Sequence, residues 1–279
     1  MVNPYDLDVK NITLLDVYNE WEARSKIALN TMKGYRSAFN RCEAIHKLKI
    51  RDIKVSTLED EMLKLKPSIQ RVFKNVMNQL YTYALKNEIV DKNLSELLTP
   101  EPIEGKTRKP FTVEEVRNIK KFKHEYNDVT IVLFYTGFRI NELLEMKKIN
   151  VDLDERCFHG GKKSKAGKTR VTPIHDDILP IVTKWVTTSK SQNLIERVPG
   201  ASLSYDVFMK NYWKRLQTYL NVSHTPHSTR HTFVTQGIKS GMNRDILKRI
   251  VGHSNGDVTN VYDHKEISEL LTEINKLKY

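Results

Sequence analysis

Apolar residues recur at helical spacing through roughly the first hundred residues. The first run starts at Thr13-Leu-Leu-Asp16, where a threonine and an acidic residue three positions apart can cap the opening backbone N–H groups of a helix. Four such runs follow one another with short connections, which predicts a compact all-α unit over residues 1–98. The runs cover 13–21 and 30–46, begin again at Ser56, and end with a long segment over 68–86.

The helical pattern breaks at 99–110, a segment with three prolines, a glycine and several charges. Proline removes a backbone donor, so this composition cannot continue a helix. We expect a linker between two domains here. Its Lys106, Arg108 and Lys109 suit a strap along a phosphate backbone, although a plain solvent-exposed linker fits equally well.

Beyond the linker the pattern becomes mixed. Thr112-Val-Glu-Glu115 repeats the helix-start signature, and the apolar run Val129–Tyr135 stops at Gly137. Short β-prone pieces over 151–174 predict a small antiparallel sheet. Further helical runs are expected at about 176–188, 204–220, 227–240, 243–251 and 265–278. The predicted fold class is therefore mainly α with a small antiparallel β-sheet (α+β), with 111–279 as the second domain.

The charge is unevenly distributed. Residues 1–105 carry 16 Lys and Arg against 15 Asp and Glu, whereas residues 106–279 carry 30 against 19, a net charge of +11. Within the first part, 24–54 hold nine basic residues and only two acidic ones. A polyanion is the natural partner for two such surfaces, and a solvated basic face without a partner is the simpler alternative.

Other classes of protein fit poorly. No stretch approaches the roughly 18 apolar residues of a membrane span, and no signal peptide opens the sequence. Cys42 and Cys157 are far apart and outside any C-x-x-C pattern, so we expect reduced thiols in a cytoplasmic protein.

Residues suited to phosphate chemistry gather near the C-terminus. His227-Ser-Thr-Arg230-His231 is followed by Gly252-His253, and Tyr262 stands nine residues after His253. A guanidinium fork can bind two phosphate oxygens, and a tyrosine can attack phosphorus when nearby cations favour its phenolate. His227 and His231 also have the spacing of an H-E-x-x-H zinc site, but an arginine in the intervening triplet opposes a metal ion. We expect neither metal nor cofactor.

Two upstream segments supply further cations. Arg139 follows an apolar helix and a glycine break in Thr136-Gly-Phe-Arg139-Ile-Asn-Glu142, which could place it in a cleft. Lys165 lies on a predicted hairpin, where one lysine could protonate a departing 5′-oxygen and its neighbours bind DNA phosphates. These expected phosphate-binding neighbours are Lys162, Lys163, Lys168 and Arg170.

Taken in order, these motifs resemble the tyrosine recombinases, or phage-type integrases, including those of phages and conjugative transposons. The motifs of that family occur here in the same order: T-G-x-R-x-x-E-L, a hairpin lysine eight residues before Pro173, H-x-x-R, G-H and a tyrosine. The resemblance covers nearly the whole chain. Thr229 departs from it, since leucine is usual before the second arginine, and we expect a change of packing only.

The resemblance implies a catalytic set of Arg139, Lys165, His227, Arg230, His253 and Tyr262. Tyr262 would attack the scissile phosphate in cis, form a 3′-phosphotyrosyl link and need no ATP. Glu142 would orient Arg139 or a neighbour. Which histidine takes the tyrosyl proton stays open.

The resemblance also implies partners. The helical unit would be a core-DNA-binding domain that grips the duplex from one side, with Lys33, Arg36 and Arg41 as candidate contacts. The apolar stripe of 265–278 would dock in a neighbouring protomer of a homotetramer on DNA, although folding back on its own domain is possible. An accessory directionality factor is a further possible partner. Many such integrases also carry a small arm-DNA-binding domain before the helical one, and this sequence starts too late to hold it. Either the protein naturally lacks that domain, as Xer-type recombinases do, or the sequence is shortened.

Three alternatives stay open. The chain could be a Xer-type recombinase that resolves chromosome dimers, a topoisomerase-like enzyme that reseals one duplex, or a catalytically silent DNA-binding protein. We expect a mobile-element integrase of prokaryotic, phage or mobile-element origin, which acts in the cytoplasm at the nucleoid. The target sequence is not predicted.

Overall fold

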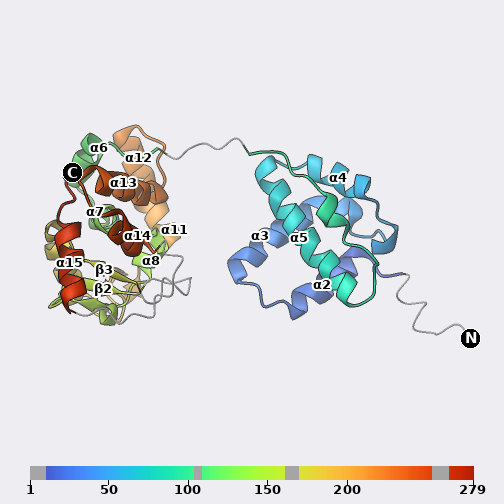
Figure 1. The fold of residues 1–279 in the computed structure, drawn as a ribbon, viewed down its shortest axis with the longest axis horizontal. Coiled ribbons are helices and arrows are strands. Elements are labelled where there is room, and N and C mark those ends of the chain that lie inside the picture. The colour runs from blue at the N-terminus through green and yellow to red at the C-terminus, as the bar shows by residue number, and fades with distance from the viewer. Residues whose placement is uncertain (1–10, 104–108, 161–169, 253–263) are drawn as a thin grey trace, which may run out of the picture. The chain divides into compact units, whose positions relative to one another are not determined.

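The chain forms two compact units, Met1–Lys106 and Thr107–Tyr279 (Figure 1). The computed structural model describes residues 11–103, 109–160, 170–252 and 264–279. Both units consist mainly of helices, and the second also holds small antiparallel sheets, which confirms the predicted fold class. None of the helices within these ranges is long and apolar enough to cross a membrane.

The first unit holds helices and no strand within residues 11–103. Thr13 and Asp16 form the expected capping box at the start of α2, and the long helix α5 packs against α2 and α3. Its apolar face closes one hydrophobic core. The elements are α2 (Leu14–Arg24), α3 (Leu29–Phe39), η1 (Asn40–Ile45), η2 (Ile50–Asp52), α4 (Val55–Leu63), α5 (Pro67–Lys86) and η3 (Leu94–Leu97).

The predicted run over 30–46 is not a single α-helix. The α-helix ends at Phe39 and continues as a 3₁₀ helix, in which Cys42 has non-helical dihedral angles. The reason is aromatic packing: the Phe39 ring stacks on Tyr18 on one side and His46 on the other, with centroids 4.0 and 4.1 Å away. The tighter turn of the 3₁₀ helix brings the His46 ring back onto the Phe39 ring.

The second unit surrounds the apolar helix α7, which is buried along almost its whole length. Its helical elements are α6 (Val113–Lys121), α7 (Asn127–Thr136), α8 (Ile140–Leu144), η4 (Lys148–Asn150), η5 (Asp176–Ile178), α10 (Leu179–Thr188), α11 (Tyr205–Phe208), η6 (Met209–Trp213), α12 (Lys214–Leu220), α13 (Pro226–Lys239), α14 (Arg244–Val251) and α15 (His264–Ile274). The capping box of Thr112 and Glu115 opens α6 as predicted.

The sheet of this unit is antiparallel in the order β1-β2-β3, with β1 at Val151–Asp152, β2 at Cys157–His159 and β3 at Val171–Pro173. It confirms the sheet predicted over 151–174. A second hairpin, β4 (Glu196–Val198) and β5 (Ala201–Ser202), was not predicted. Its turn contains Gly200 with a φ of 85°.

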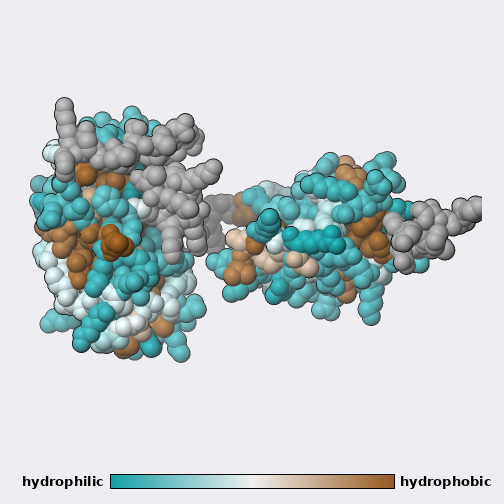
Figure 2. Space-filling model, turned by 90° about the horizontal axis from the view of Figure 1, so that it is seen from below, coloured by the Kyte–Doolittle hydropathy of each residue, from teal (hydrophilic) through white to brown (hydrophobic). Residues whose placement is uncertain are grey.

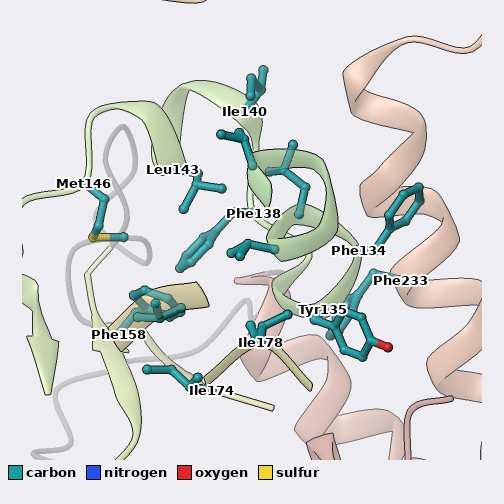
Figure 3. Packing of buried hydrophobic residues seen from close by; sticks show 14 of the residues in the cluster. Phe134, Tyr135, Phe138, Ile140, Leu143, Met146, Phe158, Ile174, Ile178 and Phe233 are labelled. Atoms are coloured by element: carbon teal, nitrogen blue, oxygen red, sulfur yellow. The ribbon is translucent and has the colours of Figure 1, made fainter. Parts of the chain in front are cut away.

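The core of the second unit joins α7 to the sheet. Phe138, in the turn between α7 and α8, points toward Phe158 of β2, with ring centroids 5.3 Å apart (Figure 3). Phe134 and Tyr135 of α7 lie in the same core as Phe233 of α13. This packing fixes the turn that carries Arg139.

The outer surface shown in Figure 2 is largely hydrophilic, with apolar side chains in small patches.

The C-terminal helix α15 packs on its own unit. Ile267, Leu270, Ile274 and Leu277 are buried in the core of the second unit, and α15 contacts β3. Tyr279 also bonds to this unit, because its hydroxyl donates to the Phe134 carbonyl at 2.7 Å. In the single chain the stripe is therefore covered by its own unit, and docking of the stripe in a neighbouring protomer stays a prediction.

Candidate active site

Arg139 stands at the turn between α7 and α8. Gly137 ends α7 with a φ of 62°, and a Cβ there would lie 2.5 Å from the Phe233 ring, so glycine is required. Arg139 is the N-cap of α8. Its side chain is 49% exposed, while its Nη1 donates to Glu142 Oε1 at 2.7 Å. The guanidinium is thus held by a carboxylate and still open to a ligand.

Glu142 is buried between two arginines. Besides the Arg139 side chain, its carboxylate accepts the Arg139 backbone N–H at 2.9 Å and Arg170 Nη2 at 3.1 Å. Burial alone would raise the pKa of Glu142, but the charge of Arg170 and the Arg139 contacts outweigh burial and lower that pKa below its ordinary value. Glu142 was expected to orient Arg139 or a neighbour, and in the structure its carboxylate contacts both Arg139 and Arg170.

Arg230 reaches the same turn from α13. It is 4% exposed, and its Nη1 donates to the Gly137 carbonyl at 2.7 Å while its Nη2 donates to the Val251 carbonyl at 2.5 Å. Burial, then the neighbouring charges of Arg139 and Arg170, lower the pKa of Arg230 to about 10. The guanidinium therefore stays charged at neutral pH.

His227 lies one helical turn before Arg230 and is half-buried. It lines a cavity of about 250 Å³ together with Arg139. The ring of His231 approaches His227 edge-on, with centroids 5.1 Å apart, and the His231 side chain is exposed. Of the expected catalytic set, the structure thus brings Arg139, His227 and Arg230 together at one place.

Four further residues of this cavity were not predicted from the sequence, and one of them is Ile140, which directly follows Arg139. Asn141 and Glu145 come from α8 and its C-terminal end, and Tyr205 from the first position of α11. Asn141 and Glu145 are four residues apart, so helical spacing after Arg139 could have placed them on one face. No signal near Tyr205 in the sequence points to the cavity, because α11 and α8 meet only in the fold.

Arg170 corrects a prediction. It was expected to bind DNA phosphates from the hairpin surface, but it is 3% exposed and paired with Glu142. Its Nη1 also donates to the Val251 carbonyl at 3.1 Å, and its guanidinium lies over the Phe138 ring at 4.6 Å. With its charge engaged inside the unit, Arg170 is not a surface contact for DNA.

The remaining candidates fall into two groups. Lys33, Arg36 and Arg41 in the first unit and Lys109 in the second are exposed, and Arg36 pairs with Glu22 at 2.9 Å. Lys165, His253 and Tyr262 of the expected catalytic set lie outside the described residues. The same holds for Lys106, Arg108, Lys162, Lys163 and Lys168.

Thr229 is accommodated by a local bond. Its side chain is buried, and its hydroxyl donates to the Pro226 carbonyl at 2.7 Å, which satisfies the polar group that a leucine would lack. The next residue, Arg230, keeps its contacts.

Among the residues that the structure describes, no group of three His, Cys, Asp or Glu side chains could hold a metal ion.

The chain belongs to the phage integrase family, whose model matches residues 109–269. The match contains Arg139, Glu142, His227 and Arg230, and it ends within α15. This membership confirms the resemblance found in the motifs and the predicted class of enzyme, a tyrosine recombinase.

Similar proteins agree with that class. The tyrosine recombinase XerA of Pyrococcus horikoshii is 28% identical over 212 residues, covering 73% of each chain. A structure of the Tn1549 transposon integrase in complex with a circular intermediate DNA matches with a TM-score of 0.74 at 19% identity, covering 94% of both chains. A lambda integrase tetramer bound to a Holliday junction matches with a TM-score of 0.73 at 16% identity, covering 94% of this chain and 84% of the other.

Proposed function

We propose that this chain is a site-specific integrase that cleaves and rejoins duplex DNA through a 3′-phosphotyrosyl intermediate on Tyr262. One observation carries the proposal: Arg230 donates to the carbonyl of Gly137, which lies 93 residues earlier in the sequence. Gly137 stands two residues before Arg139, so this bond brings the two arginines to the same turn. Two guanidinium groups at one turn suit the two non-bridging oxygens of a phosphodiester.

The proposed chemistry follows from these charges. Tyr262 attacks the scissile phosphorus, the bond to the 5′-oxygen breaks, and Lys165 gives that oxygen a proton. Arg139, Arg230, His227 and His253 stabilise the negative charge that develops on the phosphorus-bound oxygens. His227 or His253 accepts the tyrosyl proton. Attack by the 5′-hydroxyl of a partner strand reverses the step, so the bond energy is conserved without ATP.

In this proposal both units bind DNA, and only the second carries out catalysis. The helical unit, 1–98, is the core-DNA-binding domain, 99–110 the linker and 111–279 the catalytic domain. The exposed cations Lys33, Arg36, Arg41 and Lys109 contact phosphates. The excess of nine basic over two acidic residues in 24–54 supports the first three, and the net charge of +11 over 106–279 supports Lys109.

We also propose assembly as a homotetramer on DNA, supported by the similarity to the lambda integrase tetramer. Because the chain's own core covers the stripe of α15, a contact through α15 in trans requires an exchange in which each protomer receives a neighbour's helix. An accessory directionality factor belongs to the same proposal.

The test uses a pool of nicked suicide duplexes with a randomised core. After cleavage a short strand diffuses away, so any covalent adduct survives denaturation and its DNA can be sequenced. We expect an adduct with the wild type and with Tyr219→Phe, a matched control at an exposed tyrosine of α12, and none with Tyr262→Phe. No wild-type adduct, or an equal adduct with Tyr262→Phe, contradicts the proposal.

A second candidate, a Xer-type recombinase that resolves dimers, is favoured by the similarity to XerA. The selected DNA separates the two candidates. Sites at the ends of a mobile element support an integrase, whereas one chromosomal site supports dimer resolution. A two-site recombination assay then distinguishes both from an enzyme that reseals a single duplex.

A further inference from the structure

A single buried guanidinium, that of Arg170, joins three segments of the second unit. Arg170 stands directly before β3, and its carbonyl accepts the Gly160 N–H at 2.7 Å, which fixes its backbone beside the end of β2. Its side chain is 2% exposed. The direction of this side chain is therefore determined by the sheet.

The Arg170 guanidinium binds one acceptor from each of two other segments. Nη2 donates to Glu142 Oε2 of α8 at 3.1 Å, and Nη1 donates to the carbonyl of Val251, the last residue of α14, at 3.1 Å. The Phe138 ring supports the guanidinium, and a Cβ on Gly252 would lie 3.4 Å from Arg170 Cδ and Nη1. The site leaves little freedom for the side chain.

Both acceptors are shared with the two arginines that we assign to the phosphate. Glu142 also binds Arg139, and the Val251 carbonyl also accepts Arg230 Nη2. Arg170 is thus linked through one shared oxygen-bearing group to Arg139 and through another to Arg230. No residue beyond these acceptors is needed to connect the two.

A role in stability alone explains this arrangement poorly. Burying an arginine carries a desolvation penalty, which a well-packed apolar side chain would avoid. Within the part of the chain that the structure describes, the buried Arg170 Nε has no hydrogen-bond partner, and the charge of Arg139 acts against that of Arg170. A charged, forked side chain is required only if both acceptors must be held at once.

We propose that Arg170 is a positioning residue, which sets the separation of Arg139 and Arg230 by holding the carboxylate that orients one and the carbonyl that orients the other. The inference rests on the proposed function. In catalysis the separation matters because both guanidinium groups must meet oxygens of one phosphate, and a misplacement of about 1 Å can lower a rate by about 10²-fold.

The test compares Arg170→Met with Arg156→Met. Arg156 is the control, because it also binds one carboxylate, Asp176, and one backbone carbonyl, that of Ile174, beside the same sheet, rather than Glu142 and the Val251 carbonyl. The measurement is the single-turnover rate of adduct formation on a duplex selected with the wild type, at saturating protein. Binding of the same duplex and thermal unfolding are measured in parallel.

We expect Arg170→Met to form the adduct about 10²-fold more slowly, with DNA affinity close to the wild type, and Arg156→Met to keep the wild-type rate. A folded Arg170→Met with the wild-type rate, or an equal loss in Arg156→Met, overturns the inference. If the wild type itself forms no adduct through Tyr262, the proposed function fails instead.

The pH profile gives a readout that general destabilisation would not move. Glu142 faces Arg139 and Arg170, with Arg230 nearby and with Glu145 and His227 around the same cavity. Removing Arg170 removes a charge that lowers the pKa of Glu142, so Glu142 should become protonated, and release Arg139, at a higher pH. The acidic limb of the rate profile should shift upward in Arg170→Met, and an unmoved limb counts against the inference.

Arg170→Lys keeps the inference testable if the methionine variant does not fold. Lysine retains the charge but cannot span both acceptors. We expect a slower rate with the acidic limb left where the wild type has it. A wild-type rate in Arg170→Lys would show that bridging is unnecessary.

Discussion

The two units hold their positive charges in opposite ways. In the helical unit the candidate DNA contacts, Lys33, Arg36 and Arg41, are exposed around a core of apolar and aromatic side chains. In the second unit Arg170 and Arg230 are buried and bound to backbone carbonyls. The difference indicates that the first unit supplies charge to a surface, while the second fixes the direction of individual guanidinium groups at a cost in desolvation.

The largest expected effect comes from exchanging arginine for lysine in each unit. Arg230→Lys should slow adduct formation by about 10²- to 10³-fold, because one ammonium cannot hold two carbonyls and a phosphate oxygen together. Arg36→Lys should leave the rate at saturating protein unchanged. Single-turnover cleavage of the selected duplex measures both, and equal rates for the two variants would remove the distinction between the units.

Next is the cis packing of α15. Leu270→Ala should lower the free energy of unfolding by about 2–5 kcal/mol, since Leu270 is 2% exposed in the core of its own unit. Leu29→Ala, at a side chain that is 81% exposed in the first unit, is the control and should change it little. Denaturant unfolding at low protein concentration checks this. Wild-type stability in Leu270→Ala would favour a stripe that is used only between protomers.

The glycines provide a smaller contrast. Gly137→Ala should destabilise the second unit by roughly 2–4 kcal/mol, from the left-handed backbone and the contact with Phe233. Gly34→Ala, in α3 with nothing within 4 Å of the added Cβ, should stabilise the first unit by about 0.5–1 kcal/mol. Thermal unfolding monitored for each unit gives both signs, and a tolerated Gly137→Ala would contradict the tight turn before Arg139.

The smallest effect per residue is expected at the exposed cations. Replacing Lys33, Arg36 and Arg41 by alanine should weaken DNA binding and reduce the slope of log affinity against log salt by about one per lost phosphate contact. Lys64→Ala, at an exposed lysine that pairs with the buried Glu61, is the control. Binding titrations across salt concentrations measure the slope. An unchanged slope in the triple variant would remove this surface from the interface.

Much of this architecture follows from local sequence. The capping boxes at Thr13 and Thr112 and the glycine stop at Gly137 act over three or four residues, so they are readable without the fold. The contact of Glu142 with Arg139 was predictable for the same reason, since the two are three residues apart. The hairpin β4–β5 was missed because its strands are short and only its Pro199-Gly200 turn is distinctive.

The rest depends on contacts between distant segments. A lone arginine beside a run of lysines indicates a basic surface, and only the meeting of Arg170 with Glu142 and Val251 shows that it is buried. The periodicity of α15 predicts an apolar face but not which surface covers it. Tyr205 enters the cavity because α11 meets α8, a contact that no local pattern encodes.

The most direct test of the central claim is mass spectrometry of the adduct formed on the selected suicide duplex. After digestion of protein and DNA, the account predicts a peptide that carries a 3′-phosphodeoxynucleotide on Tyr262. The same peptide should be unmodified in Arg230→Ala under single-turnover conditions that suffice for the wild type. A nucleotide attached to any other residue, or no covalent link at all, would contradict cleavage by Tyr262 beside Arg139 and Arg230.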